Sequence, residues 1–380
     1  MRSSAPERLS DLLRIALFVV VCHFAVPPVL AFTSSAGIRV QGPGVPPHLG
    51  FACCEHGIEQ MQSLFDDQYV INDLRELHAE VAIPTLDFSA ERAAVVRRLN
   101  QTGIPVIAWM MLSKEEGFYL NADNAPEAAA RVAAFEKWSS DNGLKWAGVG
   151  LDIEPNFAEL AALKTHRWRL ITILLRRSLN SDRIAGARQE YSELIGQLQK
   201  RGYPVQTYQM PYIPAERSVH STLLDQLLGT VDVRGNQEYL MLYTSFARQV
   251  GAGMIWSIGR SAQAIAIGST DGDSAAGSGA GPLNWDEFSR DLIVASHFSH
   301  QIGVYDLEGC VGQGFLSRLK TFDWSQSVTI PADALQKADH LHRALQLVLW
   351  IGDHLLYLAA ILLLAVAWMA CRSRTRIVSG

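Results

Sequence analysis

The chain has 380 residues, of which 48% are hydrophobic and 19% are charged, so it can bury a large core. Its formal net charge of −5 gives no electrostatic case for a nucleic-acid partner, which calls for a basic face. Five cysteines are too few for a disulfide scaffold.

Residues 1–36 have the layout of a secretory signal. Three arginines precede an apolar stretch at 15–26, Pro27 and Pro28 end it, and small residues follow. We expect this leader to lie outside the fold, whether it is cleaved or kept as an uncleaved anchor.

Between 37 and 321, short apolar runs alternate with helical patterns. This alternation predicts parallel strands, because each crossover between them needs a helix's length of chain. Eight strands in strict alternation predict a closed (β/α)₈ TIM barrel. A doubly wound open sheet is the alternative, but no glycine-rich phosphate motif follows the first strand. The predicted strands are 48–53, 81–88, 105–112, 147–154, 204–210, 239–244, 264–268 and 302–307, and the predicted helices include 90–99, 126–139, 188–200 and 285–296.

The fourth predicted strand ends in two acids, Asp152 and Glu154. Residues two apart on a strand point to the same side, so both carboxyls would face the barrel axis. Mutual repulsion and loss of solvation should raise the pKa of at least one of them. A protonated acid beside an ionised one is suited to glycosidic cleavage. The alternative is a structural pair that backbone or arginine donors satisfy.

Active sites of barrels form where strands run into their following loops. This rule adds candidate substrate-binding residues, whose aromatic members would stack on sugar rings or else fill the core. The histidines show no metal-ligand spacing with acids or cysteines, so we predict no metal and no other cofactor. The candidate substrate-binding residues are Asp87, Trp109, Tyr208, Gln209 and Tyr305, with Tyr243 as a further site residue and Asp271, Asp306 and Glu308 as reserves.

The stretch Gly-Val-Gly-Leu-Asp-Ile-Glu at 148–154 resembles the fourth-strand signature of family 18 glycoside hydrolases, the chitinase-like barrel enzymes. Their pattern is Asp-Gly-x-Asp-x-Asp-x-Glu. Its last two acids fall on Asp152 and Glu154, whereas its first two fall on Ala147 and Gly150.

Two further stretches resemble the same family in order. Met-Leu-Tyr-Thr at 241–244 is similar to its sixth-strand Met-x-Tyr-Asp, with Thr244 in place of the acid that would recognise an N-acetyl group. The stretch 303–309 is similar to its last strand, with Tyr305 where a tryptophan usually floors the sugar site.

The resemblance implies Glu154 as general acid, Asp152 as the carboxylate that assists it, and Tyr243 as a hydrogen-bond donor to the substrate. In that family the substrate's own N-acetyl oxygen is the nucleophile. The sequence thus predicts a glycoside hydrolase-like protein that cleaves an extracytoplasmic polysaccharide.

Three alternatives stay open. A non-catalytic carbohydrate-binding or scaffold barrel of the cell envelope would fit the incomplete signature. Glu154-Pro155 is similar to the Asn-Glu-Pro of many retaining barrel glycosidases, and that reading makes Asp271 a candidate nucleophile. An unrelated barrel hydrolase is the third alternative, since a fold does not fix chemistry.

In a closed barrel the first and last strands are neighbours. Cys53, Cys54 and Cys310 follow these two strands, so we expect a disulfide between Cys310 and either Cys53 or Cys54.

The C-terminal residues predict a membrane anchor. We expect a stalk at 322–343, a transmembrane helix at 344–371 and a cytoplasmic tail at 372–380. The stretch 355–370 has no charged side chain, although Asp353 and His354 interrupt the apolar run before it. The barrel would then be periplasmic or extracellular.

The predicted orientation can be tested with a reporter enzyme fused after Gly380. It should be active in the cytoplasm, because Arg372, Arg374 and Arg376 favour that side of the membrane. Protease added outside the membrane should digest the barrel. A reporter that is active only outside would overturn the orientation.

Overall fold

The computed structural model describes residues 37–53, 55, 57–156, 158–159, 177, 181–271 and 281–378, with the backbone alone at 181 and for most of 355–378. The predicted leader at 1–36 lies outside the described residues.

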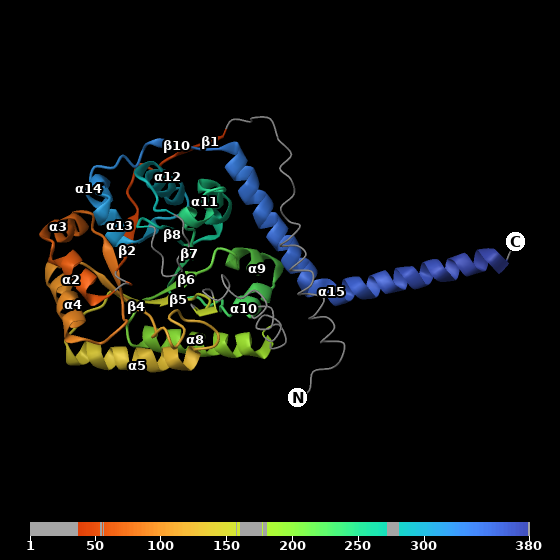
Figure 1. Cartoon of the computed structure of the whole chain (residues 1–380), viewed down its shortest axis with the longest axis horizontal. Coiled ribbons are helices and arrows are strands. Elements are labelled where there is room, and N and C mark those ends of the chain that lie inside the picture. The colour runs from red at the N-terminus through yellow and green to blue at the C-terminus, as the bar shows by residue number, and fades with distance from the viewer. Residues whose placement is uncertain are drawn as a thin grey trace.

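Eight parallel strands form a closed barrel, in which each strand pairs with the next along the chain and the last pairs with the first (Figure 1). Ala52 lies opposite Tyr305 where the barrel closes. The predicted (β/α)₈ barrel is therefore confirmed, and the open sheet is wrong. The strands are β2 (His48–Ala52), β3 (Glu80–Pro84), β4 (Val106–Met110), β5 (Gly148–Asp152), β6 (Val205–Gln209), β7 (Gln237–Met241), β8 (Ala264–Gly268) and β9 (Gln301–Tyr305).

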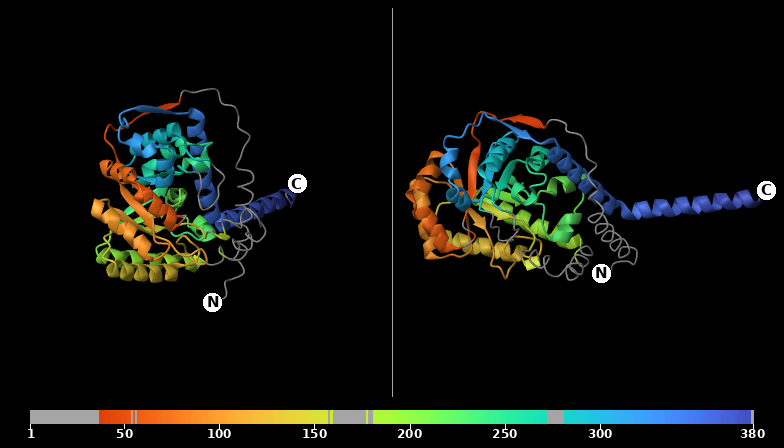
Figure 2. Two further views of the ribbon diagram at one scale, coloured as in Figure 1. Left: turned by 60° about the vertical axis from the view of Figure 1, so that its left-hand side comes forward. Right: turned by 45° about the horizontal axis from the view of Figure 1, so that its top comes forward.

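Helices surround the barrel (Figures 1 and 2), and local sequence signals set their ends. Ser89 accepts a hydrogen bond from the N–H of Arg92 to begin α4, and Gly103 ends that helix at a φ of 78°. Asn284 and Glu287 form a capping box at the start of α12. The helices are α2 (Ile58–Asp66), α3 (Gln68–Glu76), α4 (Ala90–Thr102), α5 (Ala125–Asp141), α8 (Ser181–Lys200), α9 (Ile213–Val219), α10 (Leu223–Leu228), α11 (Ala252–Ile258), α12 (Trp285–Ser296), α13 (Leu307–Gly312), α14 (Phe315–Leu319) and α15 (Ala332–Val378), with 3₁₀ turns η1 (Thr244–Ala247) and η2 (Gly259–Ser261).

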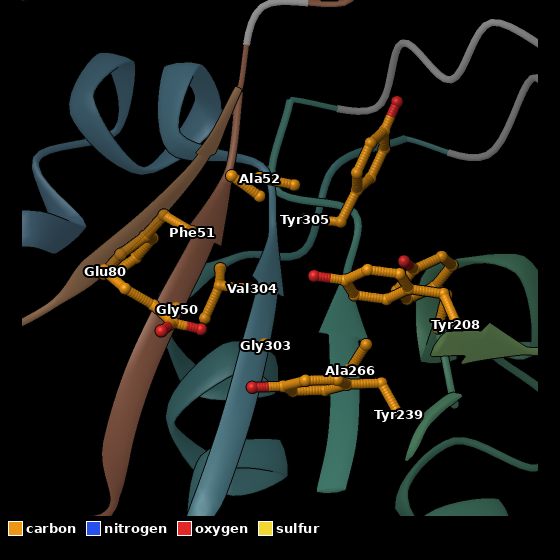
Figure 3. A pocket seen from close by; sticks show the side chains of 12 residues that line it. Gly50, Phe51, Ala52, Glu80, Tyr208, Tyr239, Ala266, Gly303, Val304 and Tyr305 are labelled. Carbon is orange, nitrogen blue, oxygen red and sulfur yellow. The ribbon is translucent and has the colours of Figure 1, made fainter. Parts of the chain in front are cut away.

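The barrel interior contains polar and aromatic side chains rather than an aliphatic core. Tyr208 and Tyr239 stack with ring centroids 5.1 Å apart (Figure 3). The Tyr208 hydroxyl donates to Gln206, whose amide donates to Glu80 on the far side of the barrel, both at 2.8 Å. This layer leaves a cavity of only ≈ 20 Å³.

Glycines in neighbouring strands make room for this layer. A Cβ at Gly150 would lie 3.0 Å from the Tyr208 ring, and one at Gly50 would lie 3.1 Å from Glu80. These distances are too short for an ordinary contact, so the large interior residues depend on small ones opposite them.

The predicted stalk at 322–343 is wrong, because this segment is part of the folded domain. Its strand β10 (Ser327–Ile330) pairs antiparallel with β1 (Ile38–Gln41), and Ile330 is fully buried. The first part of α15 then packs on α11 and α9, and Ser257 donates to Asp339 at 2.6 Å. The partner strand is nearly 290 residues away, so the local pattern could not reveal this pairing.

The rest of α15 extends away from the barrel (Figures 1 and 2). In the part of the chain that the structure describes, we find no helix with the length and apolar character needed to span a membrane. The predicted transmembrane segment at 344–371 lies mostly on residues whose side chains are outside that description.

The packing of α15 on α11 can be tested at Gly253. A Cβ there would lie 2.4 Å from the Ala334 carbonyl oxygen. Gly253→Ala should therefore lower the free energy of unfolding by about 1–3 kcal/mol, measured by chemical denaturation of the full chain. Gly186→Ala is the control, because nothing lies within 4 Å of that exposed helical position, and it should stabilise by about 0.4–1 kcal/mol. Equal stability of the Gly253→Ala protein and the wild type would contradict the packing.

Candidate active site

A cavity of ≈ 290 Å³ opens at the end of the barrel where the strands run into their following loops. Five of the eight predicted site residues line it, so the structure brings together Trp109, Asp152, Glu154, Tyr243 and Tyr305. Its other lining residues are Glu55, Tyr119, Met210, Pro211, Met241, Phe246, Ala247 and Met254.

Asp152 is the last residue of β5 and only 3% of it is exposed. The indole N–H of Trp109 donates to its Oδ2 at 3.1 Å, while its buried Oδ1 has no partner among the described residues. Burial raises the pKa of Asp152 to about 7, although the bond from Trp109 acts in the opposite direction.

Glu154 lies one residue after an isolated β-bridge that extends β5. Ile153 pairs with Leu120, and the backbone N–H of Glu154 donates to the Leu120 carbonyl at 3.0 Å. The extended backbone therefore continues past β5 and places both carboxyls in the same cavity. Burial, followed by the negative charges of Asp152 and Glu55, raises the pKa of Glu154 well above its usual range.

Glu55 is a third carboxyl in the cavity, and the sequence analysis missed it. It lies in the loop after β2, only 9% of it is exposed, and the Tyr305 hydroxyl donates to its Oε2 at 3.1 Å. Burial and the charge of Asp152 raise the pKa of Glu55 to about 8. The strand-end rule would have found it if it had been applied to the first strand.

Aromatic rings form much of the cavity wall. Tyr243 and Tyr305 stack with centroids 5.6 Å apart, and Phe246 meets Tyr243 edge-on at 5.9 Å. Flat faces of this kind pack on the apolar faces of sugar rings. Tyr119 and Phe246 lie outside the barrel strands, in segments where the sequence carries no periodic signal.

Three predicted substrate-binding residues do not line this cavity. Tyr208 lies in the layer beneath it. Gln209 points out of the barrel, where its amide donates to the Val233 carbonyl at 2.9 Å. Asp87 binds the fully buried Arg92 at 2.7 Å. Side-chain position decides the roles of Tyr208 and Gln209, and an ion pair with Arg92, a near neighbour in the chain, decides that of Asp87.

The reserve acids also lie outside the cavity lining. Asp306 caps α13 by accepting from the N–H of Gly309 at 2.8 Å, and burial raises its pKa to about 9. Asp271 contacts Ser269 at 3.2 Å, and the reading that made it a nucleophile is not supported by its position.

The predicted disulfide between Cys53 and Cys310 is wrong. Both residues are buried and they are not joined. Cys310 lies within α13, and its thiol donates to the hydroxyl of Thr270, a residue that follows β8, at 3.7 Å. Cys54 lies outside the described residues.

The structure gives the surroundings of two positions that depart from the family 18 pattern. A side chain at Gly150 would crowd the Tyr208 ring, since its Cβ would lie 3.0 Å away. Thr244, at the position of the N-acetyl-recognising acid, is buried and donates to Asp291 rather than lining the cavity. Among the described residues, no group of histidines, cysteines and acids is arranged to hold a metal ion.

No protein-family model and no curated protein matches the chain. Solved structures similar to it include the glycoside hydrolase domain of PgaB (BpsB) from Bordetella bronchiseptica, at 9% identity over 73% of this chain and 98% of that one, with a TM-score of 0.45. A 3-keto-D-glucoside 4-epimerase from E. coli has 12% identity over 72% of this chain and 99% of that one, with a TM-score of 0.40.

A third similar structure is a putative alpha-L-fucosidase from Bacteroides thetaiotaomicron. It has 9% identity over 77% of this chain and 98% of that one, with a TM-score of 0.40. Similarities this weak identify no activity, and none supports membership of family 18.

The structural role of Asp87 can be tested with Asp87→Asn. Burial raises the pKa of Asp87, but hydrogen bonds from Arg92 and Ser89 outweigh it and hold the pKa at about 2. A lowered pKa means that the ion pair stabilises the protein above about pH 4 and is lost as pH falls towards 2. The variant should lose about 1–2 kcal/mol at neutral pH, since Asp87 is partly exposed and screened.

The difference in free energy of unfolding between Asp87→Asn and the wild type should shrink as the pH falls from about 4 towards 2, as measured by denaturation at several pH values. Activity per folded molecule should be unchanged, because Asp87 does not line the cavity. A Michaelis constant that rises with unchanged stability would instead assign Asp87 to substrate binding.

Proposed function

We propose that the protein is a glycoside hydrolase that cleaves O-glycosidic bonds of a polysaccharide in the cavity at the end of the barrel. The observation that carries the proposal is the pair Asp152 and Glu154 in one aromatic-lined cavity, both with a raised pKa. Acid-assisted glycosidic cleavage requires one protonated carboxyl beside one ionised carboxyl.

In this mechanism Glu154 holds the proton and donates it to the oxygen of the leaving sugar. Water then forms the new bond to the anomeric carbon, and the proton that this water loses returns to Glu154. The carboxyls repel each other in a poorly solvated cavity, so the pair retains a proton near neutral pH. A protonated Glu154 is thereby available without a metal-bound water or a strong external acid.

Asp152 is the ionised partner. The Trp109 N–H bonds to its Oδ2 and favours the charged form. Its negative charge stabilises the positive charge that develops at the anomeric carbon as the bond breaks. Tyr243, which lines the same cavity, donates a hydrogen bond to the sugar.

We also propose that the barrel acts outside the cytoplasm and is held to a membrane. The support is the signal-like leader at 1–36, the uncharged stretch at 355–370 within α15, and the basic residues at 372–376. A polysaccharide of the cell envelope or its surroundings would be the accessible substrate.

A non-catalytic sugar-binding barrel is the second candidate. It is favoured by Gly150, which stands where family 18 has the acid that relays protons to Asp152 and which lies close against the Tyr208 ring. A sugar binder has no need of a proton donor, so turnover by the wild-type protein separates the two candidates.

Glu154→Gln tests the hydrolase proposal. The substitution keeps size and hydrogen bonding but removes the proton, so turnover should fall by about 10² or more while oligosaccharide binding survives. The measurement is release of reducing ends from a panel of polysaccharides by the full chain in detergent. Glu190→Gln, on an exposed face of α8, is the control and should keep wild-type activity. Full activity of Glu154→Gln would mean that another residue is the acid.

A further inference from the structure

The described lining of the candidate active site is strongly acidic. Three carboxyls line the cavity, from Glu55, Asp152 and Glu154, and no lysine, arginine or histidine is among the described residues that line it. Two other buried acids of the barrel have such a partner: Glu238 pairs with Arg217, and Asp291 pairs with Arg290. Buried charges are normally paired, so a ligand that carries a positive group would complement the described lining of this cavity.

The carboxyl oxygens keep capacity to accept further hydrogen bonds. Oδ1 of Asp152 is buried and has no hydrogen-bond partner among the described residues. Glu55 accepts one bond, from the Tyr305 hydroxyl. An ammonium group has three donors and no acceptor, so it matches a site made of carboxylate oxygens.

The aromatic walls of the cavity also suit an ammonium group. The rings of Trp109, Tyr119, Tyr243 and Tyr305 line the cavity beside the acids. Aromatic faces attract a cation, most strongly where water is displaced. An anionic sugar such as a uronic acid would instead meet three carboxyls and no compensating charge.

The position whose acid recognises an N-acetyl group in family 18 does not line the described part of the cavity. Thr244 occupies the position of the expected acid, but its hydroxyl is used by Asp291, and the residue does not line the cavity. A neutral acetamide would also leave the acidic charge uncompensated.

We propose that the cavity selects a glycan whose sugars carry a free, protonated amine, of the glucosamine class, and that Glu55 is the residue that binds this ammonium group. This inference rests on the proposed carbohydrate function and names its substrate class. Glu154 and Asp152 are occupied with the proton and the anomeric charge, which leaves Glu55 for the amine. The Tyr305 hydroxyl positions Glu55 for that contact.

The test compares two hexasaccharides that differ only in their acetyl groups, β-1,4-linked glucosamine and β-1,4-linked N-acetylglucosamine. Calorimetry with the full-length Glu154→Gln protein in detergent gives both dissociation constants without cleavage. The glucosamine hexamer should bind about tenfold or more tightly than the acetylated one, because a desolvated charge pair contributes at least that much.

Adding Glu55→Gln to this background should weaken binding of the glucosamine hexamer about tenfold and leave the acetylated hexamer unchanged. Glu190→Gln makes the same change in net charge on an exposed helix face and should alter neither constant. Tyr305→Phe keeps Glu55 but removes the hydroxyl that holds it, so it should weaken binding of the glucosamine hexamer by a smaller factor. This variant replaces Glu55→Gln in the test if Glu55→Gln does not fold.

Equal or tighter binding of the acetylated hexamer would overturn the inference, as would a Glu55→Gln effect of the same size on both hexamers. The proposed hydrolysis fails in a different way. If the wild type binds the glucosamine hexamer through Glu55 but releases no reducing ends from it, the ammonium site stands and the hydrolase does not. If it cleaves only acetylated or neutral glycans, the hydrolase stands and the ammonium site does not.

Discussion

The close contact between Gly150 and the Tyr208 ring is the constraint on which the site depends. The interior of a small barrel has a fixed width, so a tyrosine from one strand needs an absent side chain on its neighbour. The stacked Tyr208 and Tyr239 rings fill the space beneath the cavity (Figure 3). They close the barrel below the acids, limit access of water from that side, and fix how deep a substrate can enter.

The layer also determines which acids the site can contain. An acid at position 150 would require the Tyr208 ring to shift, because a Cβ there would lie 3.0 Å from the ring. The acids are therefore gathered at the level of the strand ends, where Glu55, Asp152 and Glu154 share one cavity. Three buried acids in one cavity destabilise the fold, a cost that proteins accept at functional sites and offset in the surrounding core.

Two strands that lie far apart in the chain meet on one side of the barrel. Strands β1 and β10 pair side by side, and α15 begins directly after β10, packing on α11 before it leaves the barrel (Figure 2). Since α11 follows η1, which contains part of the cavity wall, the helix that leaves the domain is connected to the site through one packed element. A rigid attachment of this kind would fix the orientation of the cavity relative to whatever holds the end of α15.

The sequence by itself determined the eight strands and the shared direction of Asp152 and Glu154, because alternation of apolar runs with helices and the two-residue period of a strand are local patterns. It could not place Glu55 beside them, bring the Tyr208 ring against Gly150 or join β10 to β1. Each of these depends on which residues meet across the closed barrel or between the chain ends. Such contacts join segments far apart in the chain, so only the tertiary structure decides them.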